Sequence, residues 1–151
     1  MLFGARCDRC NYAQDLSYAP RAYVLADGSQ INVSQTFAWC LSCRKVVWAE
    51  KIDDLDDITA KSGDLIQMQK VDGSMKRIDV GALMAEWRQS REGPPKCLDC
   101  GSTSITMAEP DRFNREVLIH PVCQGTIKIT DVVDAPDSDP ILYSPEGDRL
   151  R

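Results

Sequence analysis

The sequence predicts a small, β-rich α+β protein that is stapled by metal ions, with two antiparallel hairpin modules joined by a connector that carries one amphipathic helix. Three observations support this fold class. All seven cysteines and the single histidine fall into four pairs, and two residues separate the members of each pair. Short runs of β-branched and aromatic residues flank these pairs. Between the second and third pair, one segment has apolar residues at helical spacing.

The four pairs have the spacing of metal ligands. Two residues between ligands let a tight turn aim both side chains at one point, and a second turn completes a tetrahedron. Joining neighbouring pairs predicts two sites with these ligands: Cys7, Cys10, Cys40 and Cys43 in site 1, and Cys97, Cys100, His120 and Cys123 in site 2. We expect two structural Zn²⁺ ions, since four protein ligands leave no position for water or substrate.

The third and fourth pairs resemble the zinc-ribbon (rubredoxin-like) superfamily in Cys97-Leu98-Asp99-Cys100-Gly101 and His120-Pro121-Val122-Cys123. The resemblance covers about residues 5–52 and 95–133, and it implies two ribbons in one chain rather than an activity. Ribbons typically place glycine after the second ligand, where positive φ points backbone amides at sulfur. Gly101 matches this pattern and Asn11 is tolerant of it. Arg44 and Gln124 depart from it, although Gly125 follows one residue late.

Length and cysteine usage agree with metal binding. The chain has 151 residues, enough for two small modules of about 40 residues that need a metal for stability. The amino terminus has no secretory signature, and no apolar run approaches the length of a membrane span. We therefore expect a cytoplasmic protein with reduced thiols and no membrane contact. An odd number of cysteines also argues against a complete disulfide framework.

The first half of the chain divides into a ribbon and a connector. In residues 1–52, two extended runs flank Asp27-Gly28, which is a hairpin signal, and further strands enter and leave the second cysteine pair. Residues 53–96 form the connector. Its acidic start suits either a short helix or a solvated turn, 65–71 has no clear period, and 79–90 predicts an amphipathic helix capped by Asp79.

The second half repeats the plan of the first. Residues 97–133 read as a second ribbon, with strands on both sides of the histidine-containing pair. Residues 134–151 form an acidic tail rich in proline, in which only Ile141-Leu142-Tyr143 favours an edge strand.

The residues favour a binding protein over an enzyme. No catalytic residue is expected, because the only histidine is committed to metal and neither a deaminase motif nor a single thioredoxin-like dithiol is present. The interpretation is a non-catalytic zinc-ribbon adaptor that acts through contacts with a protein partner. Its partner-binding residues are not indicated by the sequence.

Two alternatives remain. Nucleic-acid association, in transcription or translation, would use basic residues near the knuckles and connector, with Trp39, Trp48 and Trp87 stacking on bases. The formal net charge of −5 disfavours a phosphate backbone as partner, and seven thiolates with two Zn²⁺ ions make the charge more negative still. The basic residues in question are Arg6, Arg9, Arg44, Lys45, Lys70, Lys76, Arg77, Arg88, Arg91 and Lys96. Electron transfer through iron in a tetrahedral thiolate site is the second alternative.

Overall fold

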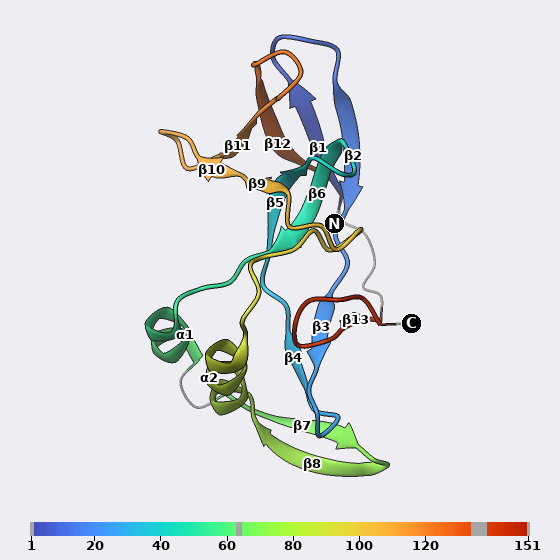
Figure 1. Ribbon diagram of the computed structural model, residues 1–151, viewed down its shortest axis with the longest axis vertical. Helices are drawn as coiled ribbons and strands as arrows, with labels where there is room; N and C mark the ends of the chain where they lie inside the picture. The colour runs from blue at the N-terminus through green and yellow to red at the C-terminus, as the bar shows by residue number, and fades with distance from the viewer. Residues whose placement is uncertain (1, 63–64, 134–138, 151) are drawn as a thin grey trace.

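The computed structural model describes residues 2–62, 65–133 and 139–150. It is mostly β, with two short helices, and Figure 1 shows an elongated molecule. A five-stranded sheet lies near one end, and the helices and a two-stranded hairpin lie near the other. Within the described residues, neither helix has the length and apolar character needed to cross a lipid bilayer.

The largest sheet is built from the two ends of the chain. Its strand order is β10-β11-β12-β1-β2, and each neighbouring pair is antiparallel. The strands are β1 (Leu2–Cys7), β2 (Ala13–Ser17), β10 (Glu109–Pro110), β11 (Glu116–Ile119) and β12 (Thr126–Val133). The predicted segments 1–52 and 97–133 therefore share a sheet, and the expectation of two ribbons placed one after the other is wrong.

A second sheet combines the middle of the chain with a later strand. Its order is β6-β5-β9, again antiparallel, with β5 (Gln35–Cys40), β6 (Lys45–Glu50) and β9 (Ile105–Met107). Aromatic rings pack it against the largest sheet, because Phe3 on β1 lies edge-on to Phe37 and Trp48 at centroid distances of 5.2 and 5.4 Å. The two metal-ligand regions thus belong to one packed body.

The remaining strands confirm two local predictions. The Asp27-Gly28 turn joins β3 (Arg21–Val24) to β4 (Gln30–Asn32), and Gly28 has the positive φ of 87° that this turn requires. The predicted tail strand is present as β13 (Ile141–Tyr143), which pairs in parallel with β3. Residues 134–138 of the predicted acidic tail lie outside the described residues.

The connector is more ordered than its sequence indicated. It contains α1 (Leu55–Ser62), β7 (Ile66–Val71), β8 (Ser74–Asp79) and α2 (Val80–Ser90). The α2 prediction is confirmed: Asp79 is its N-cap and accepts a hydrogen bond from the Ala82 amide at 3.1 Å. Trp87 on this helix stacks on Tyr23 of β3 at 4.6 Å, so the apolar face of α2 is buried against the β3–β4 sheet.

Candidate metal centres

Two clusters of four donor side chains lie in the described part of the chain. One contains Cys7, Cys10, His120 and Cys123, and the other contains Cys40, Cys43, Cys97 and Cys100. Within each cluster, all donor atoms lie within 4.8 Å of one another. The structure therefore brings together all eight of the predicted ligands.

The predicted partition of these ligands is wrong. The structure pairs the Cys7/Cys10 knuckle with His120/Cys123 rather than with Cys40/Cys43. The physical reason is the antiparallel pairing of β1 with β12, which places the turn after β1 beside the turn before β12. The inner two knuckles are likewise brought together because β9, which follows Cys100, pairs with β5, which ends at Cys40. The two sites are nested in the sequence. Throughout, site A is the cluster with His120 and site B is the cluster of four cysteines.

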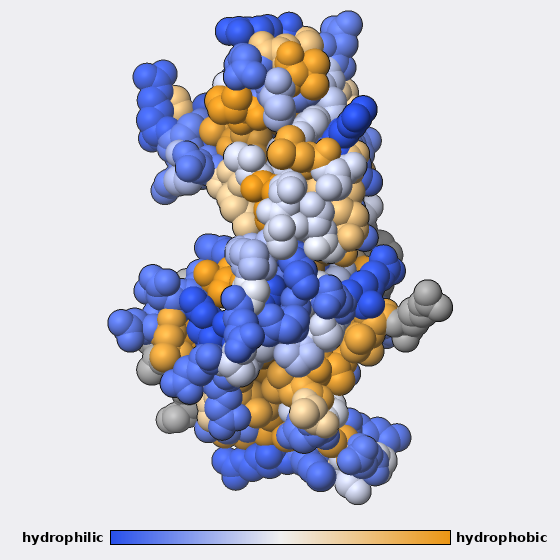
Figure 2. Space-filling view, in the orientation of Figure 1, coloured by the Kyte–Doolittle hydropathy of each residue, from blue (hydrophilic) through white to orange (hydrophobic). Residues whose placement is uncertain are grey.

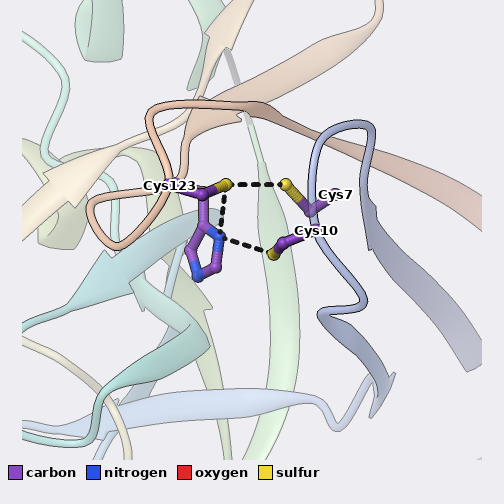
Figure 3. A group of neighbouring side chains, drawn as sticks. Cys7, Cys10 and Cys123 are labelled. Carbon is purple, nitrogen blue, oxygen red and sulfur yellow. Dashed lines mark hydrogen bonds between the residues drawn. The ribbon is translucent and has the colours of Figure 1, made fainter.

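The donor atoms of site A converge on one point, as Figure 3 shows. The Cys7 and Cys123 sulfurs are 3.4 Å apart, and His120 Nδ1 lies 3.3 Å from both the Cys10 and Cys123 sulfurs. Zinc bonds of about 2.3 Å to sulfur and about 2.0 Å to nitrogen put tetrahedral donors roughly 3.5–3.8 Å apart. The cluster therefore fits a tetrahedral ion once its donors move apart by a few tenths of an ångström.

Site B has the same size with four sulfur donors. The Cys40 and Cys100 sulfurs are 3.6 Å apart, and those of Cys43 and Cys97 are 4.0 Å apart. Cys40 and Cys97 are buried, whereas Cys100 is exposed. These distances fit Zn²⁺ and also iron, since both accept tetrahedral thiolate ligands.

Three of the four knuckles share one backbone turn. The amide of the residue after the second ligand donates to the carbonyl of the first, at 2.8 Å, from Arg44 to Cys40, from Gly101 to Cys97 and from Gln124 to His120. This residue has positive φ in each case, namely 55°, 79° and 63°. The turn thus forms even where the sequence departs from glycine, at a cost of about 1 kcal/mol for each non-glycine residue.

The ligand sulfurs also accept backbone hydrogen bonds. Amides of Arg9 and Tyr12 donate to Cys7 and Cys10 at 3.4 Å, and Gly125 donates to Cys123 at 3.3 Å. Desolvation works to raise the pKa of the Cys7 thiol, but hydrogen bonds from the Arg9 and Cys10 backbone outweigh it and lower this pKa to about 6. Cys7 is therefore largely a thiolate, ready for a metal, at neutral pH.

In site B the thiol pKa values shift in both directions. Desolvation works to raise the pKa of Cys100, but hydrogen bonds, first from the Ser102 backbone, outweigh it and lower this pKa. Burial, followed by interactions with the neighbouring cysteines, raises the pKa of Cys43. Burial also raises the pKa of Cys97 to about 11, against the lowering effect of backbone amides at the knuckle. Four thiolates this close repel one another, so their joint ionisation requires a bound cation.

Contacts between the two sheets support the sites through residues that were not among the predicted ligands. Tyr12 packs against His120 at a centroid distance of 5.0 Å, and Trp39 from the other knuckle region packs against the same ring at 5.1 Å. Gln14 on β2 bonds to the Val46 backbone on β6 through both ends of its side chain. These roles have no signal in the sequence, because each depends on how the two sheets pack.

Many of the predicted basic residues already have partners. Arg6 pairs with Asp15 and Lys45 with Asp99, while Lys96 pairs with Asp148. Arg91 is buried in an ion pair with Glu50 at 2.7 Å, and the Arg88 guanidinium donates to the Asp53 carbonyl. The three tryptophans that we considered for base stacking are all buried, with exposed fractions of 8% or less.

Comparison of the chain with protein-family models, with curated protein sequences and with solved structures gives no match. The features that bear on function are therefore the two clusters and the surfaces around them.

Proposed function

We propose that the protein is a non-catalytic scaffold that holds two structural Zn²⁺ ions and binds another protein. The observation that carries the proposal is the pair of four-donor clusters, each with a complete tetrahedral set. A complete set leaves no open position for water or substrate, which is the mark of a structural rather than a catalytic site. The single histidine of the chain belongs to one of these sets, so it is committed to structure.

The exposed apolar side chains favour a protein as the partner. Several lie at or near the knuckles, and Figure 2 shows apolar surface at this end of the molecule, over the loops that follow β1 and β11. Others lie on the β7–β8 hairpin at the opposite end. The first group is Leu41, Ile119 and Val122, and the second is Ile66, Met68 and Met75. Exposed apolar clusters of this kind mark protein contacts more often than phosphate contacts.

Elemental analysis and spectroscopy test the metal half of the proposal. We expect two zinc ions per chain, a colourless protein, and loss of the β circular dichroism signal when a strong chelator removes zinc. Zinc sites of this kind contribute on the order of 10 kcal/mol to folding, more than most small domains possess in total. A coloured protein with iron in site B would favour the electron-transfer alternative. A chain that keeps its fold in chelator would overturn the structural role.

A pair of binding assays tests the partner half. We expect affinity capture from native lysate to enrich a specific protein, and we expect the Leu41→Ser, Val122→Ser double variant to lose that enrichment. The β7–β8 variant Met68→Ser, Met75→Ser is tested in parallel, and a loss of enrichment in this variant instead would place the partner contact on the β7–β8 hairpin. A mobility shift with an oligonucleotide at low salt, combined with no enriched protein, would favour the nucleic-acid alternative instead.

A further inference from the structure

A groove lies between the two metal centres. Its volume is about 500 Å³, and it is lined by Tyr12, Trp39, Leu41, Arg44, His120, Pro121 and Val122. We call it the knuckle groove, because Leu41 and Arg44 come from a knuckle of site B, whereas Pro121 and Val122 come from a knuckle of site A. The volume lies within the range of roughly 300–1,000 Å³ that is usual for ligand pockets.

The walls of the groove are apolar and exposed. Leu41 has an exposed fraction of 55% and Val122 of 81%, and each is in the middle of its knuckle. Trp39 and Tyr12 form the floor, with their rings edge-on to each other at a centroid distance of 5.5 Å. Both walls are held by turns that end at metal ligands, so the groove is preformed when both sites are filled. Preformed apolar walls lower the entropic cost of binding a side chain.

The free polar groups of the groove are hydrogen-bond donors. Trp48 and Trp87 donate their indole N–H groups to the Ser17 and Pro145 carbonyls, but Trp39 Nε1 has no acceptor within the described residues. No buried side-chain nitrogen there lacks a partner, so the Trp39 N–H reaches the surface. His120 turns Nδ1 toward the sulfurs, which leaves Nε2 carrying the proton when Nδ1 binds metal. The one hydroxyl, on Tyr12, is already bonded to Gln14 and to the Val46 amide.

Arg44 supplies the charge. Its side chain forms no hydrogen bond or ion pair with any residue that the structure describes, whereas the adjacent Lys45 pairs with Asp99 at 3.7 Å. No carboxylate is among the residues that line the groove. The groove therefore combines apolar walls with N–H donors and one unpaired cation, and offers no free negative acceptor.

We propose that the knuckle groove binds a segment of a partner protein in which a large apolar side chain stands next to a carboxylate. The apolar side chain would lie against the half-buried Tyr12 ring, between the Leu41 and Val122 walls. The carboxylate would accept from the Arg44 guanidinium, with the Trp39 indole N–H as a second donor. This inference rests on the proposed function, because filled metal sites fix both walls and the His120 tautomer.

A nucleic acid fits this groove less well. The groove presents a single unpaired cation, which matches one carboxylate, whereas affinity for a nucleic-acid backbone comes from several phosphate contacts. Trp39 has an exposed fraction of only 4%, so its face is not available to a stacked base. A side chain of a peptide can enter through the open side of the groove without stacking on the face of Trp39.

Fluorescence anisotropy with synthetic peptides tests the inference. The probes are labelled peptides in a Gly/Ser background in which Asp or Glu stands on either side of Leu, Phe or Trp, with Asn and Gln versions as controls. We expect the acidic peptides to bind the zinc-loaded full chain at least about fivefold more tightly than their amide counterparts. In two-dimensional NMR, the Trp39 indole signal should shift on binding while the Trp48 and Trp87 signals stay in place.

Two variants and their matched controls locate the binding. Arg44→Gln should remove the preference for acid over amide, and Val122→Ser should weaken both kinds of peptide. Arg77→Gln, on the β8 strand at the far end of the molecule, and Leu65→Ser, just before β7, should change neither. Zinc content of every variant is measured, so that a lost metal is not mistaken for a lost contact.

Any one of the following outcomes overturns the inference. Equal binding of acidic and amide peptides removes the role of Arg44, and an unmoved Trp39 signal removes the groove as the site. Binding of oligo-dT that is lost in Arg44→Gln assigns the groove to nucleic acid. A dimer in light scattering that becomes a monomer in Val122→Ser assigns it to a second copy. A chain that holds two zinc ions but binds no peptide loses this inference and keeps the scaffold, whereas a chain without zinc loses the proposed function.

Discussion

The side chain of Gln14 pairs with both backbone groups of Val46. Its Nε2 donates to the Val46 carbonyl at 2.9 Å, and its Oε1 accepts from the Val46 amide at 3.2 Å. A side chain on β2 thus covers the edge of β6 as a neighbouring strand would, and joins the sheet of site A to the sheet of site B. Together with the packing of Phe3 on Phe37 and Trp48, this contact holds the two sheets, each with its candidate metal site, in one body.

Replacing Gln14 with Ala should weaken the contact between the two sheets. We expect the free energy of unfolding in urea, at saturating zinc, to fall by about 1–2 kcal/mol, because two backbone groups lose a partner. Exchange of the Val46 amide should become faster, although Tyr12 retains part of its protection. Gln14→Glu is the matched control, since it keeps the acceptor and removes the donor, and its effect should be intermediate. An unchanged exchange rate of the Val46 amide in Gln14→Ala would show that the contact between the sheets does not depend on the Gln14 hydrogen bonds.

Gly125 and Gly101 should respond differently to a methyl group. A Cβ at Gly125 would lie 2.6 Å from Arg9 Cβ and 2.9 Å from the Cys7 sulfur, whereas a Cβ at Gly101 would meet nothing within 4 Å. We expect Gly125→Ala to lower the metal occupancy of site A. Gly101→Ala, with φ of 79°, should cost about 1 kcal/mol in backbone strain and keep both metals. Elemental analysis and urea unfolding measure the two effects, and equal zinc content in both variants would contradict the packing at site A.

Breaking the buried ion pair of Glu50 and Arg91 should destabilise the fold far more than breaking a solvent-exposed pair. Two contacts of 2.7 Å join the two side chains, which are essentially inaccessible to solvent. Arg91→Met leaves the Glu50 carboxylate buried without its partner, and we expect a loss of about 3–5 kcal/mol in the free energy of unfolding. Lys96→Ala breaks the pair with Asp148, whose carboxylate is exposed to solvent, and should cost no more than about 1 kcal/mol. Similar losses in the two variants would contradict this prediction.

Tyr23 should make the fold sensitive to alkaline pH. Burial of its ring, and then the Glu50 carboxylate that accepts from its hydroxyl, raise the pKa of this phenol above its usual value. The folded state then keeps the proton to higher pH than the unfolded state does. The stability from this group is complete below the unfolded pKa of about 10, and it is lost as pH rises from there through the folded pKa.

Urea unfolding of wild type and Tyr23→Phe across this range measures that effect. The difference in the free energy of unfolding between the two proteins should be constant up to about pH 10 and should shrink above it. The phenolate absorbance just above about pH 10 should be the same in both, because Tyr23 is still protonated in the folded protein. A difference that does not change with pH would show that Tyr23 titrates as an exposed tyrosine does.

The sequence predicted the local features of this fold well. The Asp79 cap, the Asp27-Gly28 hairpin and the strands around Cys40 and Cys43 each depend on residues that are close in the chain. The β7–β8 hairpin was not assigned, because most of its residues are exposed on both faces and no apolar alternation marks it. Its turn, Asp72-Gly73, carries the same Asp-Gly signal as Asp27-Gly28, and both residues have positive φ.

The eight ligands could be predicted, but their partition could not. The four knuckles have the same spacing, so any two of them can complete a tetrahedron. Choosing neighbours in the sequence assumes that a short loop closes more easily. Cys10 and His120 are 110 residues apart, yet loop closure over that length costs only about 1 kcal/mol more than closure over a loop of the size between Cys10 and Cys40. The pairing of β1 with β12 outweighs so small a term.

NMR of the chain loaded with spin-active cadmium tests the nested partition most directly. Cadmium replaces zinc at thiolate sites, and its scalar coupling to cysteine β protons identifies which cysteines bind the same ion. The account predicts one cadmium coupled to Cys7, Cys10 and Cys123 and a second coupled to Cys40, Cys43, Cys97 and Cys100. A single cadmium coupled to both Cys10 and Cys40, or fewer than two cadmium signals, would contradict it.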